Sequence, residues 1–225
     1  MNSLAGRTIL GFLQLFIFLG AALFAPAWTF DFWQAWVYLF VFIASSALIT
    51  IYLWKFDPKL LERRVKAGPR AEKENGQKLI QVLASLVFIA MLLLPSFDHR
   101  YHWSHPPIIL VIAGDVLVAL GFLAIFLVYK ENTFTSATIE VAPGQRVIST
   151  GPYAIVRHPM YAGALAMLLA TPLALGSWWG ILMIVPMIFV LVLRLLDEER
   201  FLRVSLPGYT EYCQRVRFRL APFIW

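Results

Sequence analysis

Two clusters of reactive side chains stand in the last third of the sequence, on either side of a long apolar stretch. The first is the segment RHPMY at residues 157–161, and the second is the acidic run DEER at residues 197–200, preceded by Arg194. Guanidinium, imidazole and phenol groups can hold an anionic ligand, and carboxylates can hold a cation or accept a proton. If the two clusters meet in space, one pocket presents both kinds of group.

The His158-Pro159 pair predicts where a helix begins. A residue before proline is biased away from helical backbone, whereas proline fits the first helical turn. His158 and Tyr161 are therefore expected at the start of a helix, where free N–H groups and the positive dipole end favour a carboxylate. The alternative is that Arg157, Tyr153 and Tyr161 only anchor the chain at a membrane interface.

The three adjacent carboxylates at 197–199 are expected at the end of a helix, where they oppose its dipole. They need neighbouring arginines or a bound cation. Arg194 and Glu198 are four residues apart and share one helix face, so they can pair. The alternative is a solvated helix end with salt bridges within the helix.

The composition excludes most soluble classes of protein. The 225 residues are 60% hydrophobic and 14% charged, whereas a soluble domain has about 45–50% apolar and about 25% charged residues. Disorder, coiled coil and collagen are excluded. The net charge of +6 lies in loops between apolar segments, so no nucleic-acid partner is predicted. Cys213 is the single cysteine, which excludes a disulfide framework and a cysteine-based zinc site.

Apolar segments long enough to cross a membrane, about 20 residues each, lie at 8–28, 32–54, 79–97 and 107–129. The tract 161–196 is too long for one span, and Pro172 and Gly176 interrupt it. We predict an all-α, polytopic transmembrane helix bundle of five to six spans, in which the last two helices form a tight hairpin. The first arm, 161–175, is either a short span or a re-entrant arm.

The basic residues predict the orientation. With six spans, 18 of the 19 Lys and Arg residues fall on one side and only Arg100 on the other. Because positive loops face the cytoplasm, both termini are expected there. The hairpin then brings the DEER run back to the side of RHPMY.

We divide the chain into a four-helix transmembrane scaffold, 1–129, and a catalytic region, 130–225.

Asp115 lies inside the fourth span. It is either a functional carboxylate or a neutral group that is hydrogen-bonded between helices. His99, His102 and His105 have a spacing that suits a metal, or they form a wet surface loop. We predict no metal site.

The motifs GPYAIVRHPMYAG, DEERFL and GYTEYCQRVRFRLAPFIW, in this order around an apolar hairpin, resemble the isoprenylcysteine carboxyl methyltransferase family. The resemblance includes its small bacterial relatives and, more distantly, phospholipid methyltransferases. It implies an S-adenosyl-L-methionine-dependent membrane methyltransferase in a bacterial inner membrane. It also implies a lipophilic acceptor that enters from the bilayer, with membrane lipids and no protein as partners.

The resemblance assigns residue roles. Arg194 matches the arginine that binds the acceptor carboxylate, and Glu198 matches the first glutamate of EExxL; both are expected at the reacting centre. Gln145 stands where the eukaryotic enzymes have histidine. The residues expected to bind the cofactor are Gln145, Arg146, Val147, Ile148, Tyr153, His158, Pro159, Met160, Tyr161 and Glu198.

Two other functions remain open. An NADPH-dependent sterol-type reductase shares the RHPxY pattern, although Met160 and Ala164 differ from its usual residues. A non-enzymatic transporter would need more intramembrane polar residues and two related halves. The acceptor itself stays open between a prenylcysteine carboxylate, a small thiol, a fatty acid and a phospholipid amine.

Overall fold

The structure is a computed structural model that describes residues 4–65, 72 and 74–225. Its long helices are α1 (Leu4–Ala27), α2 (Trp33–Phe56), α4 (Asn75–Tyr101), α5 (Ile108–Glu131), α6 (Pro159–Ala174) and α7 (Ile184–Ser205). Shorter elements are α3 (Pro58–Val65), α8 (Tyr209–Arg215) and the 3₁₀ turns η2 (Gly151–Ala154) and η3 (Trp179–Met183). The described ranges contain no strand, so the predicted all-α fold is confirmed. The segment between the second and third apolar segments, residues 55–78, carries many of the basic residues that predict the orientation, and it lies partly outside the described residues.

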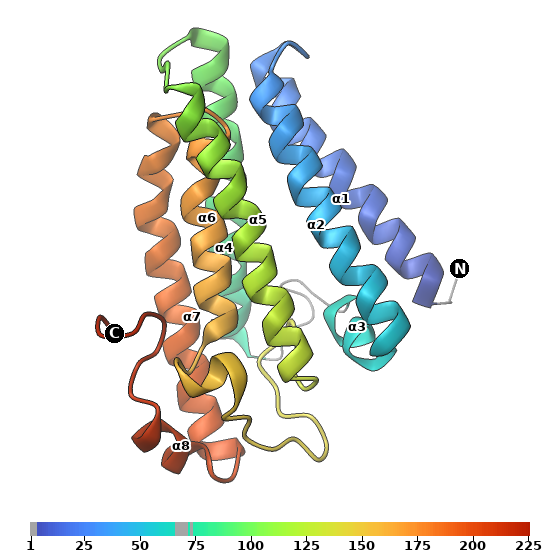
Figure 1. The fold of residues 1–225 in the computed structure, drawn as a ribbon, viewed down its shortest axis with the longest axis vertical. Helices are drawn as coiled ribbons and strands as arrows, with labels where there is room; N and C mark the ends of the chain where they lie inside the picture. Colours follow the sequence, from blue (N-terminus) through green and yellow to red (C-terminus); the bar gives the residue numbers. More distant parts are fainter. Residues whose placement is uncertain (1–3, 66–71, 73) are drawn as a thin grey trace.

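Among the residues that the structure describes, five segments are long and apolar enough to cross a membrane: α1, α2, α4, α5 and the continuous stretch Trp179–Ser205. The apolar helix α6 has only 16 residues, which is about 24 Å at about 1.5 Å per residue. It carries the chain from the end of the bundle where α5 stops to the end where η3 begins (Figure 1). The expectation of five to six spans is confirmed, and α6 is the short arm.

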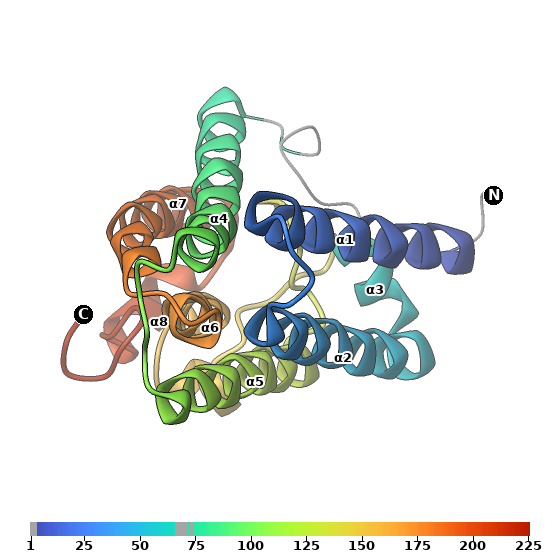
Figure 2. The same cartoon turned by 90° about the horizontal axis from the view of Figure 1, so that it is seen from above.

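Helix α6 is central, because α2, α4, α5 and α7 all contact it and surround it in the view along the bundle (Figure 2). Its closest partner is α5, where glycines replace side chains. A Cβ added at Gly121 would stand 2.8 Å from the Gly163 carbonyl oxygen, and one at Gly163 would stand 3.1 Å from the Gly121 oxygen. Small residues let membrane helices approach at backbone distance. This contact fixes the position of the helix that follows His158.

The turn between α6 and η3 is pinned to the end of α4 by a buried carboxylate. Gly176 has a φ of 71°, which glycine adopts without strain. Asp98 accepts hydrogen bonds from Ser177 and, at 2.5 Å, from Ser104. The tight turn that the sequence predicts near Gly176 is therefore present.

The histidine loop packs against other elements. The His99 ring stacks on Phe32 with centroids 4.0 Å apart, and its Nε2 lies 2.9 Å from the Asp31 carbonyl oxygen. His102 ends α4 in the left-handed conformation. Within the ranges that the structure describes, no three His, Cys, Asp or Glu side chains group as metal ligands.

Asp115 faces the interior of the bundle with 6% of its surface exposed. Neither carboxylate oxygen has a hydrogen-bond partner among the described residues. The expected hydrogen bond between helices is therefore not found in the described part of the chain, and a functional role of Asp115 stays a prediction.

Candidate active site

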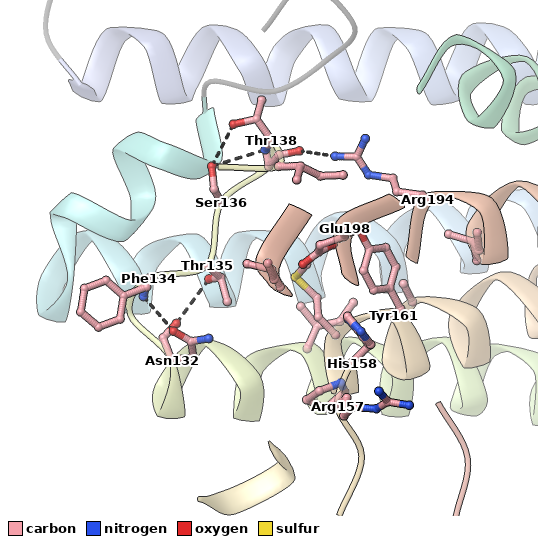
Figure 3. A pocket seen from close by; sticks show the side chains of 18 of the residues that line it. Asn132, Phe134, Thr135, Ser136, Thr138, Arg157, His158, Tyr161, Arg194 and Glu198 are labelled. Carbon is pink, nitrogen blue, oxygen red and sulfur yellow. Dashed lines mark hydrogen bonds between the residues drawn. The ribbon is translucent and has the colours of Figure 1, made fainter. Parts of the chain in front are cut away.

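A cavity of about 530 Å³ lies where α4–α7 meet the connecting segment 132–148 and helix α8. Its polar end carries Arg157, His158, Tyr161, Arg194 and Glu198 on neighbouring elements (Figure 3). Its apolar lining comprises Phe42, Ala84, Phe88, Ile125, Met167, Leu168, Met187 and Leu191. The cavity thus joins a charged chamber to a hydrophobic one.

The RHPMY segment has the local structure that its sequence predicts. His158 precedes α6 with a non-helical φ of −125°, and Pro159 is its first residue. The C-terminal tail runs alongside this segment. The N–H groups of Arg157 and His158 donate to the carbonyl oxygens of Phe218 and Arg219 at 2.9 and 3.0 Å. The tail therefore fixes the direction in which both side chains point.

Glu199 is the charge centre behind the cavity. Its Oε1 lies 3.0 Å from Arg157 Nη1 and 3.3 Å from His158 Nε2, and its Oε2 accepts from Arg219 Nε at 3.2 Å. Only 3% of Glu199 is exposed. These partners provide the compensation that an acidic helix end requires. Both oxygens are occupied, so Glu199 is not a free base.

Glu198 points to a different partner from its neighbour. Its Oε2 accepts a hydrogen bond of 2.6 Å from the Tyr161 hydroxyl. Adjacent residues on an α-helix differ by about 100° in direction, so Glu198 lines the cavity while Glu199 lies behind it. The phenol thus joins the start of α6 to the end of α7 at the cavity wall.

Tyr153 stands on η2 at the cavity edge. Asn132 Nδ2 donates to its hydroxyl oxygen at 2.9 Å, and the Tyr212 hydroxyl donates to its carbonyl oxygen at 2.8 Å. Burial raises the pKa of Tyr153 above its ordinary value, so the phenol keeps its proton at neutral pH. Because its oxygen already accepts a hydrogen bond, the O–H group is available to donate.

Arg194 is held by a residue distant in sequence. Its Nη2 donates to Glu72 Oε1 at 2.5 Å and to the Ala137 carbonyl oxygen at 3.2 Å. Its Nη1 is buried without a hydrogen-bond partner in the described part of the chain. The expected pairing with Glu198 is replaced by this contact with Glu72.

The structure brings all the residues that were expected to bind the cofactor or the acceptor to one cavity. Its lining includes Gln145, Arg146, Val147, Ile148, Tyr153, His158, Pro159, Met160, Tyr161, Arg194 and Glu198. Within this set, Gln145 turns its Oε1 to the N–H of Ala142 at 2.8 Å. The chemical roles of these lining residues stay predictions.

Four further residues were missed: Glu72, Asn132, Tyr209 and Tyr212. The Tyr209 hydroxyl lies 3.4 Å from His158 Nε2, and the GYTEY motif gave a signal for both tyrosines. Glu199 was expected, beside Glu198, as a candidate base for an amine acceptor, and its contacts with Arg157 and Arg219 were not predicted. Nothing in the sequence separates Glu72 from the other charges of its loop, because its partner is 122 residues away.

Comparisons with known proteins agree with the position of this site. A family model described as phospholipid methyltransferase matches residues 109–206. The chain is also 33% identical to a Delta(14)-sterol reductase of Mus musculus over 95 residues, which are 39% of this chain and 22% of that protein. The chain thus spans about a fifth of that relative's length.

The match to the family model begins inside α5, and the domain division at residue 130 stays a prediction. The resemblance drawn from the motifs is confirmed at the level of this wider family: residues 109–206 match its model, in a chain whose described residues include five membrane-type helices.

Proposed function

We propose that this protein is an integral membrane methyltransferase that uses S-adenosyl-L-methionine and methylates a lipophilic acceptor at the cytoplasmic membrane face. The observation that carries the proposal is one cavity that joins the RHPMY and DEER clusters to an apolar chamber; both clusters lie within the region matched by the methyltransferase family. We further propose a bacterial inner membrane, with both termini in the cytoplasm. The type of membrane and the side of the termini are proposed from the sequence alone.

The residues of the polar chamber suit this methyl donor. The bound cofactor supplies a methyl group on a positively charged sulfur, and it also carries a carboxylate and an amine. Buried Arg157 Nε has no partner among the described residues, and such a donor suits a carboxylate. Glu198 and the phenol faces of Tyr153 and Tyr161 suit the cationic groups. The volume of about 530 Å³ is within the range of about 300–1,000 Å³ for ligand pockets.

The acceptor is expected in the apolar chamber with its polar head near Arg194. An ionised carboxylate or thiolate needs no general base, so the protein contributes mainly positioning. An amine acceptor needs a base. Glu198 fills that role better than Glu199, because both oxygens of Glu199 are bonded to cationic partners or His158. A prenylcysteine-like carboxylate is the acceptor that the motifs favour.

The second candidate is an NADPH-dependent sterol-type reductase. The 33% identity to a sterol reductase over 95 residues favours it. The first experiment is calorimetry on detergent-purified protein with S-adenosyl-L-methionine and, separately, with NADPH. We expect binding of S-adenosyl-L-methionine alone. Binding of NADPH alone would replace the methyltransferase by the reductase.

Glu198→Ala is expected to lower the affinity for S-adenosyl-L-methionine about tenfold or more. The variant removes a carboxylate from the cavity wall and leaves the Tyr161 hydroxyl without its partner, and hydrogen bonds to charged groups contribute about 1.5–3 kcal/mol. Asp197→Ala is the matched control, because Asp197 is adjacent in sequence but does not line the cavity. Equal affinity in both variants would remove Glu198 from the cofactor site.

Arg194→Ala is expected to preserve cofactor binding while it lowers turnover about tenfold to hundredfold. The guanidinium lines the cavity and has one nitrogen without a hydrogen-bond partner among the described residues. Loss of a charge-assisted hydrogen bond of about 1.5–3 kcal/mol predicts that factor. Calorimetry and methyl-transfer rates on the same preparation separate the two effects. Unchanged turnover would contradict the acceptor role.

A further inference from the structure

We propose that Glu72 determines how strongly the acceptor site selects for negative charge, because it holds Arg194 and opposes a second carboxylate there. The inference rests on the proposed acceptor role of Arg194. It concerns a residue outside the matched region 109–206 and outside the motifs of the sequence analysis. Glu72 acts through Arg194 and is therefore a positioning residue.

Both carboxylate oxygens of Glu72 accept hydrogen bonds within the protein. Its Oε1 accepts from Arg194 Nη2 at 2.5 Å, and its Oε2 accepts from the N–H of Ile139 at 3.3 Å. Its side chain is 1% exposed, and that of Arg194 is 9% exposed. The pair is therefore shielded from solvent, where charge interactions are stronger than at a surface.

The two members of the pair differ in their relation to the cavity. Arg194 lines it together with Ala137 and Ile139, whereas Glu72 does not. Figure 3 shows the Arg194 guanidinium turned toward the segment that carries Ser136 and Thr138. Glu72 and the Ala137 carbonyl oxygen both bind Nη2, and Nη1 has no hydrogen-bond partner in the ranges that the structure describes. Arg194 can therefore offer one nitrogen to an acceptor and not the two-nitrogen fork that binds a carboxylate most strongly.

The charges around Arg194 weaken its attraction for an anion. Glu72 pairs with the guanidinium, and the Glu198 carboxylate also interacts with it electrostatically. A carboxylate that reached Nη1 would be the third near one guanidinium, and like charges at such a site repel. A neutral isostere of the same shape keeps the hydrogen bond without this repulsion. The wild-type site is therefore expected to discriminate weakly between the two.

The test compares two ligands of one shape in three proteins. The ligands are an S-prenylated N-acylcysteine with a free carboxylate and its carboxamide, and their affinities are measured by calorimetry on detergent-purified protein. Glu72→Gln keeps the side-chain shape and an oxygen for Arg194 but removes the charge. Glu74→Gln removes the same charge two residues away, at an exposed position, and is the matched control.

We expect the preference for carboxylate over carboxamide to rise about tenfold in Glu72→Gln and to stay at the wild-type value in Glu74→Gln. Glu72→Asp keeps the charge, so it should keep the wild-type preference even if its absolute affinities fall. An unchanged preference in Glu72→Gln, or no detectable binding of either ligand to any of the proteins, would overturn the inference.

A separate titration with S-adenosylhomocysteine tests the proposed function on the same samples. Its binding should be equal in wild type and Glu72→Gln, because Glu72 does not line the cavity. Absence of that binding in the wild type would reject the proposed function. The ligand preference would still report on Glu72 and Arg194 by itself.

Discussion

Replacement of Glu199 by alanine is expected to lower the free energy of unfolding by about 3–5 kcal/mol, the usual cost of removing one partner from a buried ion pair. The carboxylate is 3% exposed and contacts Arg157, His158 and Arg219 within 3.3 Å. The variant leaves Arg157, whose side chain is 5% exposed, as an uncompensated buried charge. Cofactor binding should fall with stability, because Arg157 and His158 line the cavity.

The measurement is denaturant unfolding of the detergent-purified protein, followed by calorimetry with S-adenosyl-L-methionine at a temperature where the variant is folded. Arg203→Ala is the control. Arg203 is 3.8 Å from the same carboxylate, and its side chain is 43% exposed. Such an outer pair contributes about 0–1 kcal/mol. Similar losses in the two variants would mean that Glu199 is not the centre of this network.

The sequence predicted the helices and the meeting of the two motifs because both depend on local patterns. Apolar length defines the spans, His158-Pro159 defines a helix start, and a glycine turn returns the chain to the same side. The cavity residues from Gln145 to Glu198 follow from this topology. In a chain where RHPMY leads into α6 and DEER lies near the end of α7, the two motifs have few other ways to be placed.

Side-chain partners across the bundle could not be predicted in the same way. Glu198 and Glu199 are identical and adjacent, and only the rotation of α7 against α6 decides which contacts Tyr161 and which contacts His158. The helical spacing suggested Glu198 as the partner of Arg194, but Glu72 enters from a loop 122 residues earlier. Such pairs depend on tertiary packing, for which a single sequence carries no signal.

Gly114→Ala is expected to destabilise the protein by about 1–3 kcal/mol, the usual cost of overpacking a close contact. A Cβ at Gly114 would collide with the backbone nitrogen of Ala174 and stand 2.8 Å from its Cα and 2.9 Å from the Leu173 carbonyl carbon. Backbone atoms cannot rotate away, so α5 and α6 must separate. Because α6 begins at the cavity, cofactor affinity should fall as well.

Gly11→Ala is the control, and it is expected to stabilise the protein slightly or to leave its stability unchanged. Gly11 lies inside α1, and a Cβ there meets nothing within 4 Å. In an open helix position alanine is favoured over glycine by up to about 1 kcal/mol. The two variants add the same methyl group, so denaturant unfolding isolates the contact between helices. If Gly114→Ala is as stable as Gly11→Ala, the approach of α5 to α6 is not as close as the structure has it. The contact between Gly121 and Gly163 would then be the remaining glycine contact that supports the placement of His158 and Tyr161.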